Sequence, residues 1–211
     1  PNTTAPLSNT SEYKEVIPFK NVIVLMDTTP PVITLISPEN PSYKRGSGSL
    51  PVNVTIELKV DGTGSKPINI SINGNAVPAG DISSTSDPNI VTVSTIVGFN
   101  PDGKYDLSIK AEDGAGNKSE LDPKLTIYID TKNPNISGSL NNAGKLILNL
   151  DGTGSPIEYI KVNGDDKAFT PLGNTATVDI TISSTLATIE VGDKAGNKVS
   201  AIFSATWRPD H

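Results

Sequence analysis

The stretch VNVTIELKVDGTGS, residues 52–65, decides the fold class. Apolar and polar residues alternate from Val52 to Val60, and two glycines then interrupt the pattern. A period of two places the apolar side chains on one face of a strand and the polar side chains on the other. The stretch therefore predicts a β-strand with one face in a core and the other in water.

The same period of two recurs along the chain. Ile68, Ile70 and Ile72 continue it, and Asn73-Gly74, a pair favoured in tight hairpin turns, closes that segment. Further alternating segments lie at 105–111, 125–129, 146–150, 178–182 and 187–191. No window shows a helical period. Short strands with turn residues about every ten positions predict an all-β chain built from small β-sandwiches.

Three landmarks occur twice in the same order. They are an Asp-Thr junction that leads into proline, the sequence DGTGS, and the motif D-x-A-G-N-K, found at 27–31 and 130–134, 61–65 and 151–155, and 113–118 and 193–198. Such a repeat predicts two homologous units in tandem. We expect one sandwich at 28–130, called here the first copy, and a smaller one at 131–208, called the second copy.

The remaining sequence adds two expectations. Residues 1–27 predict a partly disordered segment with one strand, because the apolar run at 22–25 ends in an Asp-Thr junction as 125–130 does. That strand is interpreted as the last strand of a preceding domain, cut from a longer polypeptide. The first copy is longer around 38–50 and 79–89, which predicts loops where a function specific to this copy would lie.

Composition excludes several function classes. The chain has no cysteine, and its single histidine is the last of 211 residues, so thiolate, histidine-triad and histidine-metal chemistry are not expected. The net charge of −6 disfavours nucleic acid and anionic membranes as partners. No apolar run approaches the ~20 residues of a membrane helix, so no membrane insertion is expected. We predict that the chain is not an enzyme.

The pattern D-G-x-Y-x-L-x-I-x-A-x-D from Asp102 to Asp113, followed by Ala-Gly-Asn, narrows the class. Together with the Asp-Thr junctions it resembles the tandem bacterial immunoglobulin-like (Big-type) domains of surface adhesins, S-layer proteins and secreted enzymes. The resemblance implies an Ig-like β-sandwich in each copy and an extracellular or cell-surface location. It places Tyr105 where such sandwiches carry a tyrosine corner, with Thr185 at the matching place of the second copy.

In an Ig-like sandwich the repeated landmarks would meet at one end of each copy. Carboxylate and amide oxygens from several loops suit calcium, the one cofactor that this arrangement suggests. The alternative is ordinary turn chemistry, because Asp, Asn and Gly are the usual turn formers. The candidate calcium ligands are Asp27, Asp61, Asp113 and Asn117 in the first copy, and Asp130, Asp151, Asp193 and Asn197 in the second.

Candidate binding residues outside these clusters are few. Aromatic residues make up only 5% of the chain, which gives little support for stacking on sugars. Tyr43, beside Lys44 and Arg45 in the segment 38–50, is the best surface candidate. Trp207, the sole tryptophan, is expected in the core or at a junction.

These observations predict a non-catalytic structural or adhesive module, such as a stalk, an S-layer-like segment or part of an adhesin. The alternative is an accessory region of a large secreted enzyme, such as a protease or glycosidase, that binds substrate or stabilises the catalytic domain. The expected partners are other domains of the parent polypeptide. Self-assembly, a host protein and a glycan stay open as further partners.

Overall fold

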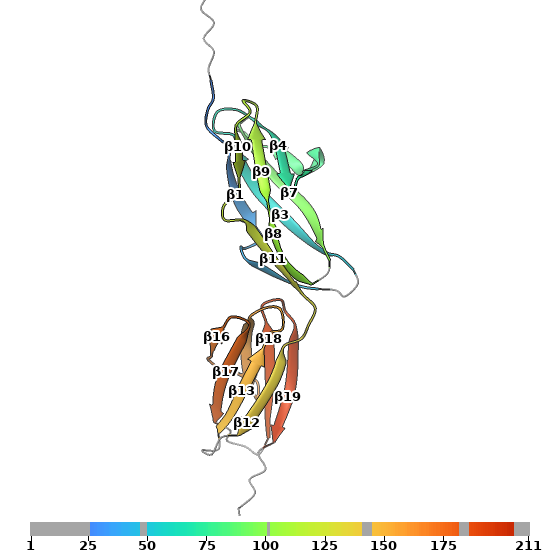
Figure 1. Cartoon of the computed structure of the whole chain (residues 1–211), viewed down its shortest axis with the longest axis vertical. Coiled ribbons are helices and arrows are strands. Elements are labelled where there is room, and N and C mark those ends of the chain that lie inside the picture. The colour runs from blue at the N-terminus through green and yellow to red at the C-terminus, as the bar shows by residue number, and fades with distance from the viewer. Residues whose placement is uncertain (1–25, 47–49, 101, 141–144, 182–185, 205–211) are drawn as a thin grey trace, which may run out of the picture.

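The computed structural model consists of two β-sandwiches joined end to end (Figure 1). It describes residues 26–46, 50–100, 102–140, 145–181 and 186–204. Each sandwich has its own hydrophobic cluster, drawn from residues 54–129 and from residues 146–191. The predicted strand at 20–26, except for Met26, lies outside the described residues, as do Thr185 and Trp207.

The first sandwich has two layers. One layer is an antiparallel sheet in the order β1 (Val32–Ser37), β3 (Val52–Asp61), β7 (Ile90–Phe99), β6 (Ile82–Ser84). The other contains β10 (Lys118–Glu120), β9 (Ile109–Asp113), β4 (Pro67–Ile72) and β5 (Asn75–Ala76), and is extended by β2 (Ser42–Arg45), β11 (Leu125–Asp130) and β8 (Gly103–Leu107). One 3-10 turn, η1 (Ala79–Asp81), connects β5 to β6.

The second sandwich repeats this topology. Its first sheet runs β12 (Asn135–Leu140), β13 (Lys145–Asp151), β17 (Thr175–Thr181), β16 (Thr170–Leu172). Its second sheet runs β15 (Asp165–Asp166), β14 (Ile157–Val162), β18 (Leu186–Asp193), β19 (Lys198–Ser204). Two antiparallel sheets with this strand order, facing each other across one core, are the Ig-like sandwich. The chain is thus a tandem pair of Ig-like domains, as the repeat predicts.

The alternation in β3 is confirmed. Ile56, Leu58 and Val60 are fully buried, while the neighbouring Thr55 and Lys59 are exposed. β3 pairs with β1 on one side and with β7 along its whole length on the other. It therefore lies in the middle of its sheet, and its apolar face forms much of the core of the first copy.

The predicted alternation is wrong at Ile68, which is 58% exposed although Ile70 and Ile72 are buried. The register of β4 against β9 shifts between Pro67 and Asn69. This bulge adds one residue to β4 and turns Ile68 outward, while Pro67 takes the buried position. The second copy has the same irregularity between Ile157 and Tyr159.

The segment 105–111, predicted as one strand, is divided at Ser108. β8 before it pairs with β11, and β9 after it pairs with β4 and β10. The backbone groups of Ser108 are taken by the β4–β5 turn: its N–H donates to Asn73 Oδ1, and its carbonyl accepts the Asn73 N–H. Both bonds hold the hairpin against the strand.

The two segments predicted as loops of the first copy both contain strands. Segment 38–50 includes β2, which adds parallel to β11, and segment 79–89 includes η1 and β6. In the described part of the second copy, no strand corresponds to β2. Of this extra length, only β2 widens the sheet that contains β11, the strand that leads into the second copy.

The two separate cores predict separate responses to core truncation. Leu58 and Leu148 are both fully buried on the central strands β3 and β13. We expect Leu58→Ala and Leu148→Ala each to cost about 2–5 kcal/mol, because the lost methyl groups leave a cavity. Amide hydrogen exchange in each sandwich would show the loss in the altered copy. An equal loss in both copies would mean that the pair unfolds as one unit.

Candidate functional site: the aspartate junctions

The repeated DGTGS segment forms the same tight loop in both copies. Asp61 Oδ1 accepts the Thr63 N–H at 2.9 Å, and Asp151 Oδ1 accepts the Thr153 N–H at 2.8 Å. Both threonines have a left-handed backbone, with φ of 57° and 62°. The Thr63 hydroxyl donates within the loop, to Gly62 O at 2.8 Å, and reaches the carbonyl of Pro30 at 3.2 Å.

Both glycines of the loop are required by close approach. A Cβ on Gly62 would lie 1.7 Å from the Ser65 carbonyl oxygen, which no side chain can tolerate. A Cβ on Gly64 would lie 2.9 Å from the carboxyl carbon of Asp27, and one on Gly154 would lie 2.6 Å from that of Asp130. The glycines thus let the loop close over the carboxylate of the Asp-Thr junction.

In the first copy the loop and the D-x-A-G-N turn meet at Asp27. The Ser65 hydroxyl donates to Asp27 Oδ2, and Asp27 Oδ1 accepts the Thr29 N–H at 3.0 Å. Asn117 Nδ2 donates to the Asp27 carbonyl at 3.1 Å and to Asp113 Oδ2 at 3.0 Å. We call this set the first junction cluster.

The second junction cluster repeats these contacts and is more deeply buried. Ser155 Oγ donates to Asp130 Oδ2 at 3.0 Å, and Asn197 Nδ2 donates to the Asp130 carbonyl at 3.2 Å and to Asp193 Oδ2 at 3.1 Å. Asp130 is only 2% exposed, and Ser155, Asp193 and Asn197 are fully buried. Because Asp130 is also the last residue of β11, this cluster joins the two sandwiches.

The structure brings most of the predicted ligands together, but not all. Hydrogen bonds connect Asp27, Asp113 and Asn117 in one cluster and Asp130, Asp193 and Asn197 in the other. Asp61 and Asp151 instead hold the first turn of their own loops. Sequence reasoning missed Ser65 and Ser155, although both close the repeated DGTGS segment and so carried the signal.

The carboxylate of Asp113 is stabilised in its ionised form. Burial would raise the pKa of Asp113, but hydrogen bonds from the Asn117 side chain and from the backbone N–H groups of Asn117, Ala115 and Gly116 outweigh it. The Ala115 and Asn117 N–H groups each lie 2.9 Å from Asp113 Oδ1. The net effect lowers the pKa of Asp113 below its ordinary value.

The predicted binding residues Tyr43, Lys44 and Arg45 lie on β2, beside the second copy. The rings of Tyr43 and Tyr128 are stacked with centroids 4.8 Å apart, and Lys194 Nζ of the second copy lies 5.7 Å from the Tyr43 ring centroid. Burial, followed by the neighbouring Tyr128, raises the pKa of Tyr43. Lys44 lines a cavity of about 560 Å³ with Tyr43 and Lys194, and Arg45 is exposed beside Asp130 in register.

Further contacts fix the chain where it leaves the first copy. The Gly46 N–H donates to the Asp130 carbonyl at 2.8 Å. The Asp102 carboxylate accepts both the Thr131 N–H, at 3.0 Å, and the Thr131 hydroxyl. A Cβ on Gly46 would lie 2.1 Å from Thr131 Cγ2, so a larger residue there would displace the Thr131 side chain.

Calcium and ordinary turn chemistry both stay predictions for the two clusters. Among the described residues, no group of three or more acidic or histidine side chains is arranged to hold a metal ion. Protein donors contact both carboxylate oxygens of each clustered aspartate, including Asp130 Oδ1, which accepts the Lys132 N–H at 3.0 Å. Asn197 Oδ1 is the one buried side-chain oxygen of the clusters with no hydrogen-bond partner, and it would be the first ligand offered to a cation or a water molecule.

Comparison with known proteins gives structural likeness only. No protein-family model matches the chain, and a search of curated proteins finds no significant match. Similar solved structures include the fibronectin(III)-like modules of Clostridium thermocellum CbhA, with a TM-score of 0.47, 12% identity and coverage of 81% of this chain and 91% of that one. A trimodular endoglucanase has a TM-score of 0.42 and 12% identity. The match covers 83% of this chain but only 36% of the endoglucanase, so this chain spans about a third of its length. The titin fragment I67–I69 has a TM-score of 0.38 and 16% identity, and the match covers 84% of this chain and 65% of that one.

At such identities and TM-scores, none of these structures indicates a function for this chain. Within the described ranges, no helix is long and apolar enough to span a bilayer.

One thermal melt separates calcium binding from turn chemistry. Because protein donors already contact the clustered carboxylates, we expect the same midpoint in excess EDTA and in millimolar calcium. A calcium ion bound only to the folded state would add about 2.7 kcal/mol at a hundredfold excess over Kd, and the midpoint would rise by several degrees. A saturable rise that Asp193→Asn abolishes would assign calcium to the second junction cluster.

The lowered pKa of Asp113 predicts a loss of stability in acid. A carboxylate with a depressed folded-state pKa contributes stability above its unfolded pKa of about 3.9, and that contribution disappears as the pH falls through the folded-state value. We expect Asp113→Asn to be less stable than the wild type at pH 6, and this difference to shrink below about pH 4. Urea unfolding at a series of pH values measures it. Glu39→Gln, an exposed site in the same copy, controls for the change in net charge.

Proposed function

We propose that this chain is a non-catalytic structural or adhesive module of a bacterial cell-surface or secreted protein, in which two Ig-like sandwiches form a stiff extended unit. The observation that carries the proposal is the double role of Asp130. This residue ends the last strand of the first copy and is also the buried centre of the second junction cluster. A stalk, an S-layer-like segment and an adhesin all need modules held at a fixed spacing.

The argument for stiffness rests on buried hydrogen bonds. The second copy donates to the Asp130 carbonyl through Asn197 and to its carboxylate through Ser155 and Lys132. Each such bond contributes only about 0.5–1.5 kcal/mol net, but a buried polar group left without its partner costs about 1–3 kcal/mol. Bending at residue 130 would break several at once, so the cost rises quickly with the bend angle.

A second contact lies away from the chain crossing. Lys194 occupies the second position of the D-x-A-G-N-K motif, where the first copy has Gly114, and its ammonium lies over the Tyr43 ring on β2. Two separated contact points restrict rotation more than one does. The extra strand of the first copy thus supports the proposed spacer role by bracing the second copy.

The first junction cluster supports a longer array. Asn117 and Ser65 contact Asp27 just as Asn197 and Ser155 contact Asp130. A sandwich whose last strand ended at Asp27 would therefore be held by the first copy in the same way. We propose an extracellular array built from such units, with other domains of the parent polypeptide as the main partners.

The alternative role is that of an accessory region of a secreted protease or glycosidase. In that role the same stiff pair would set the distance between a catalytic domain and its substrate. The parent reading frame distinguishes the two roles, since it either encodes a catalytic domain or does not. A glycan and host-protein array would test the adhesin role directly, and binding there would favour adhesion over a pure spacer.

The proposal predicts that the two sandwiches tumble as one body. In residual dipolar coupling measurements, both copies of the wild type should share one alignment tensor, and small-angle scattering should show an extended pair. Tyr43→Ala and Lys194→Gly should make the tensors diverge with little change in the stability of either core.

Lys161→Ala is the matched control, because Lys161 makes a similar contact with Tyr159, 5.5 Å from the ring centroid, inside the second copy. It should leave the shared tensor intact. Different tensors in the wild type, or a compact globule by scattering, would contradict the proposal.

A further inference from the structure

The first copy has an open sheet edge along half of β7. This strand is 10 residues long, but β6 pairs only with Val91, Thr92 and Val93. From Ser94 to Phe99, β7 has a strand partner only on its β3 side, among the residues that the structure describes. An unpaired edge of this kind is a template on which another strand can form hydrogen bonds.

The backbone groups that face this edge can be identified. The Ile90 N–H and carbonyl bond to Asp87 and Thr85 on the β6 side. The ladder between β3 and β7 runs without a register shift, so every second residue points the same way as Ile90. Ser94, Ile96 and Gly98 therefore direct their N–H and carbonyl groups away from β3, toward the open edge.

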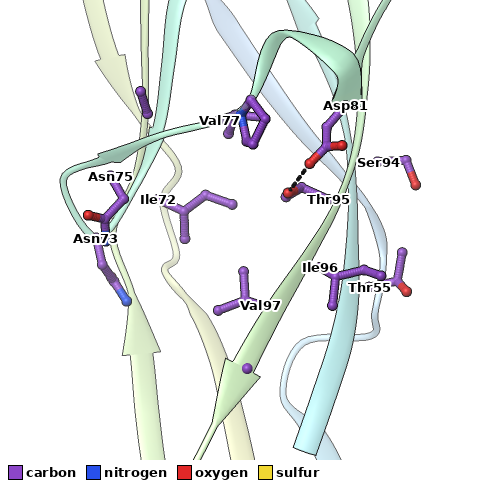
Figure 2. Close-up of a pocket in the computed structure, with 13 residues that line it drawn as sticks. Thr55, Ile72, Asn73, Asn75, Val77, Asp81, Ser94, Thr95, Ile96 and Val97 are labelled. Atoms are coloured by element: carbon purple, nitrogen blue, oxygen red, sulfur yellow. Dashed lines mark hydrogen bonds between the residues drawn. The ribbon is translucent and has the colours of Figure 1, made fainter.

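A cavity of about 610 Å³ lies beside this edge, between β7 and the β4–β5 hairpin (Figure 2). Ile72, Val77 and Val97 give it an apolar part, beside polar lining residues such as Asn75 and Ser94. Asp81, on η1, borders it, and its Oδ2 accepts the Thr95 hydroxyl at 2.6 Å. Asp81 is the only ionisable residue that lines the cavity.

The second copy shows what a protected edge looks like. Pairing with the central strand places Thr95 opposite Ile56 in the first copy and Ile180 opposite Leu146 in the second, the corresponding positions of the two sheets. The second copy thus has an apolar Ile180 where the first has Thr95, and a charged Asp179 where the first has Ser94.

Natural edges are protected by charged side chains, prolines or bulges. From Ser94 to Phe99 the edge of β7 carries no charged side chain and no proline, and Ile96 is 65% exposed. The difference between the copies makes the β7 edge, and not its counterpart on β17, open to strand addition.

We propose that an extended peptide segment of another protein adds to β7 as an extra strand at Ser94, Ile96 and Gly98. Its backbone would pair with β7, alternate apolar side chains would enter the cavity, and a lysine or arginine would face Asp81. Charge complementarity selects this occupant, because the cavity has one carboxylate and the chain carries a net charge of −6. The edge accommodates about five residues at ~3.3 Å per residue.

This site deepens the proposed adhesive role by naming its partner chemistry, and it lies apart from the junction clusters. If no peptide adds to β7 while both copies still share one alignment tensor, this inference fails and the proposed function stands. A second copy of the chain is a poorer occupant than a peptide, since like net charge opposes self-association.

The test is an NMR titration of the full chain with a capped seven-residue peptide of alternating valine and threonine that carries one central lysine. We expect shifted signals and slower hydrogen exchange at the amides of Ser94, Ile96 and Gly98, with no change at Asp179. A peptide with the same side chains but N-methylated alternate amides should not bind, because strand addition needs its backbone N–H groups. A glutamate peptide should bind more weakly.

Asp81→Asn keeps an oxygen that can accept the Thr95 hydroxyl. It should lower the affinity for the lysine peptide about two- to fivefold, the effect of losing one exposed charge pair. Asp179→Asn removes the same charge from the second copy and should leave binding unchanged. Equal binding of the N-methylated peptide, or no change at the β7 edge, would overturn the proposal. Edge protection that grows with protein concentration, together with a dimer in sedimentation velocity, would overturn it in favour of a second copy.

Discussion

The buried hydrogen-bond cluster around Asp130 is the constraint on which the arrangement of the two sandwiches depends. A carboxylate that is 2% exposed must have its oxygens satisfied, and here Ser155 and the Lys132 N–H satisfy them. The Asp130 carbonyl is held by Asn197 from one copy and by Gly46 from the other. Desolvation makes each of these contacts expensive to lose, so the relative orientation of the domains becomes part of the folded structure.

The same loop contacts occur in both copies, but their surroundings differ. In the first copy Asp27, Ser65 and Asn117 are half-buried, whereas in the second the first sandwich covers their counterparts. The two copies share the glycines and the serine that let the loop close on the aspartate. They differ at Lys194, which faces Tyr43, and at Thr95, which borders the open edge. Differences between the copies thus coincide with the places where each copy meets something outside its own core.

The covering of sheet edges by additional strands explains much of the remaining architecture. A small sandwich always leaves sheet edges, and unpaired edges invite association. The first copy extends one layer with β2, which pairs with β11 and supports the second copy. In the other layer β6 covers only the first part of β7 and leaves the rest beside a cavity. A polar Thr95 in the core-facing row is tolerated there because Asp81 accepts its hydroxyl.

The sequence by itself determined the all-β class, the tandem repeat and most of the residues that gather at each junction. Alternation such as that of residues 52–60 is a local property of a strand, and the repeated motifs mark the same local turns twice. Only the tertiary structure decided that Ile68 faces outward, that Ser65 and Ser155 contact the aspartates while Asp61 and Asp151 do not, and that Tyr43 stacks on Tyr128. These outcomes depend on a bulge in one register and on segments far apart in the chain, and a period of two carries no information about either.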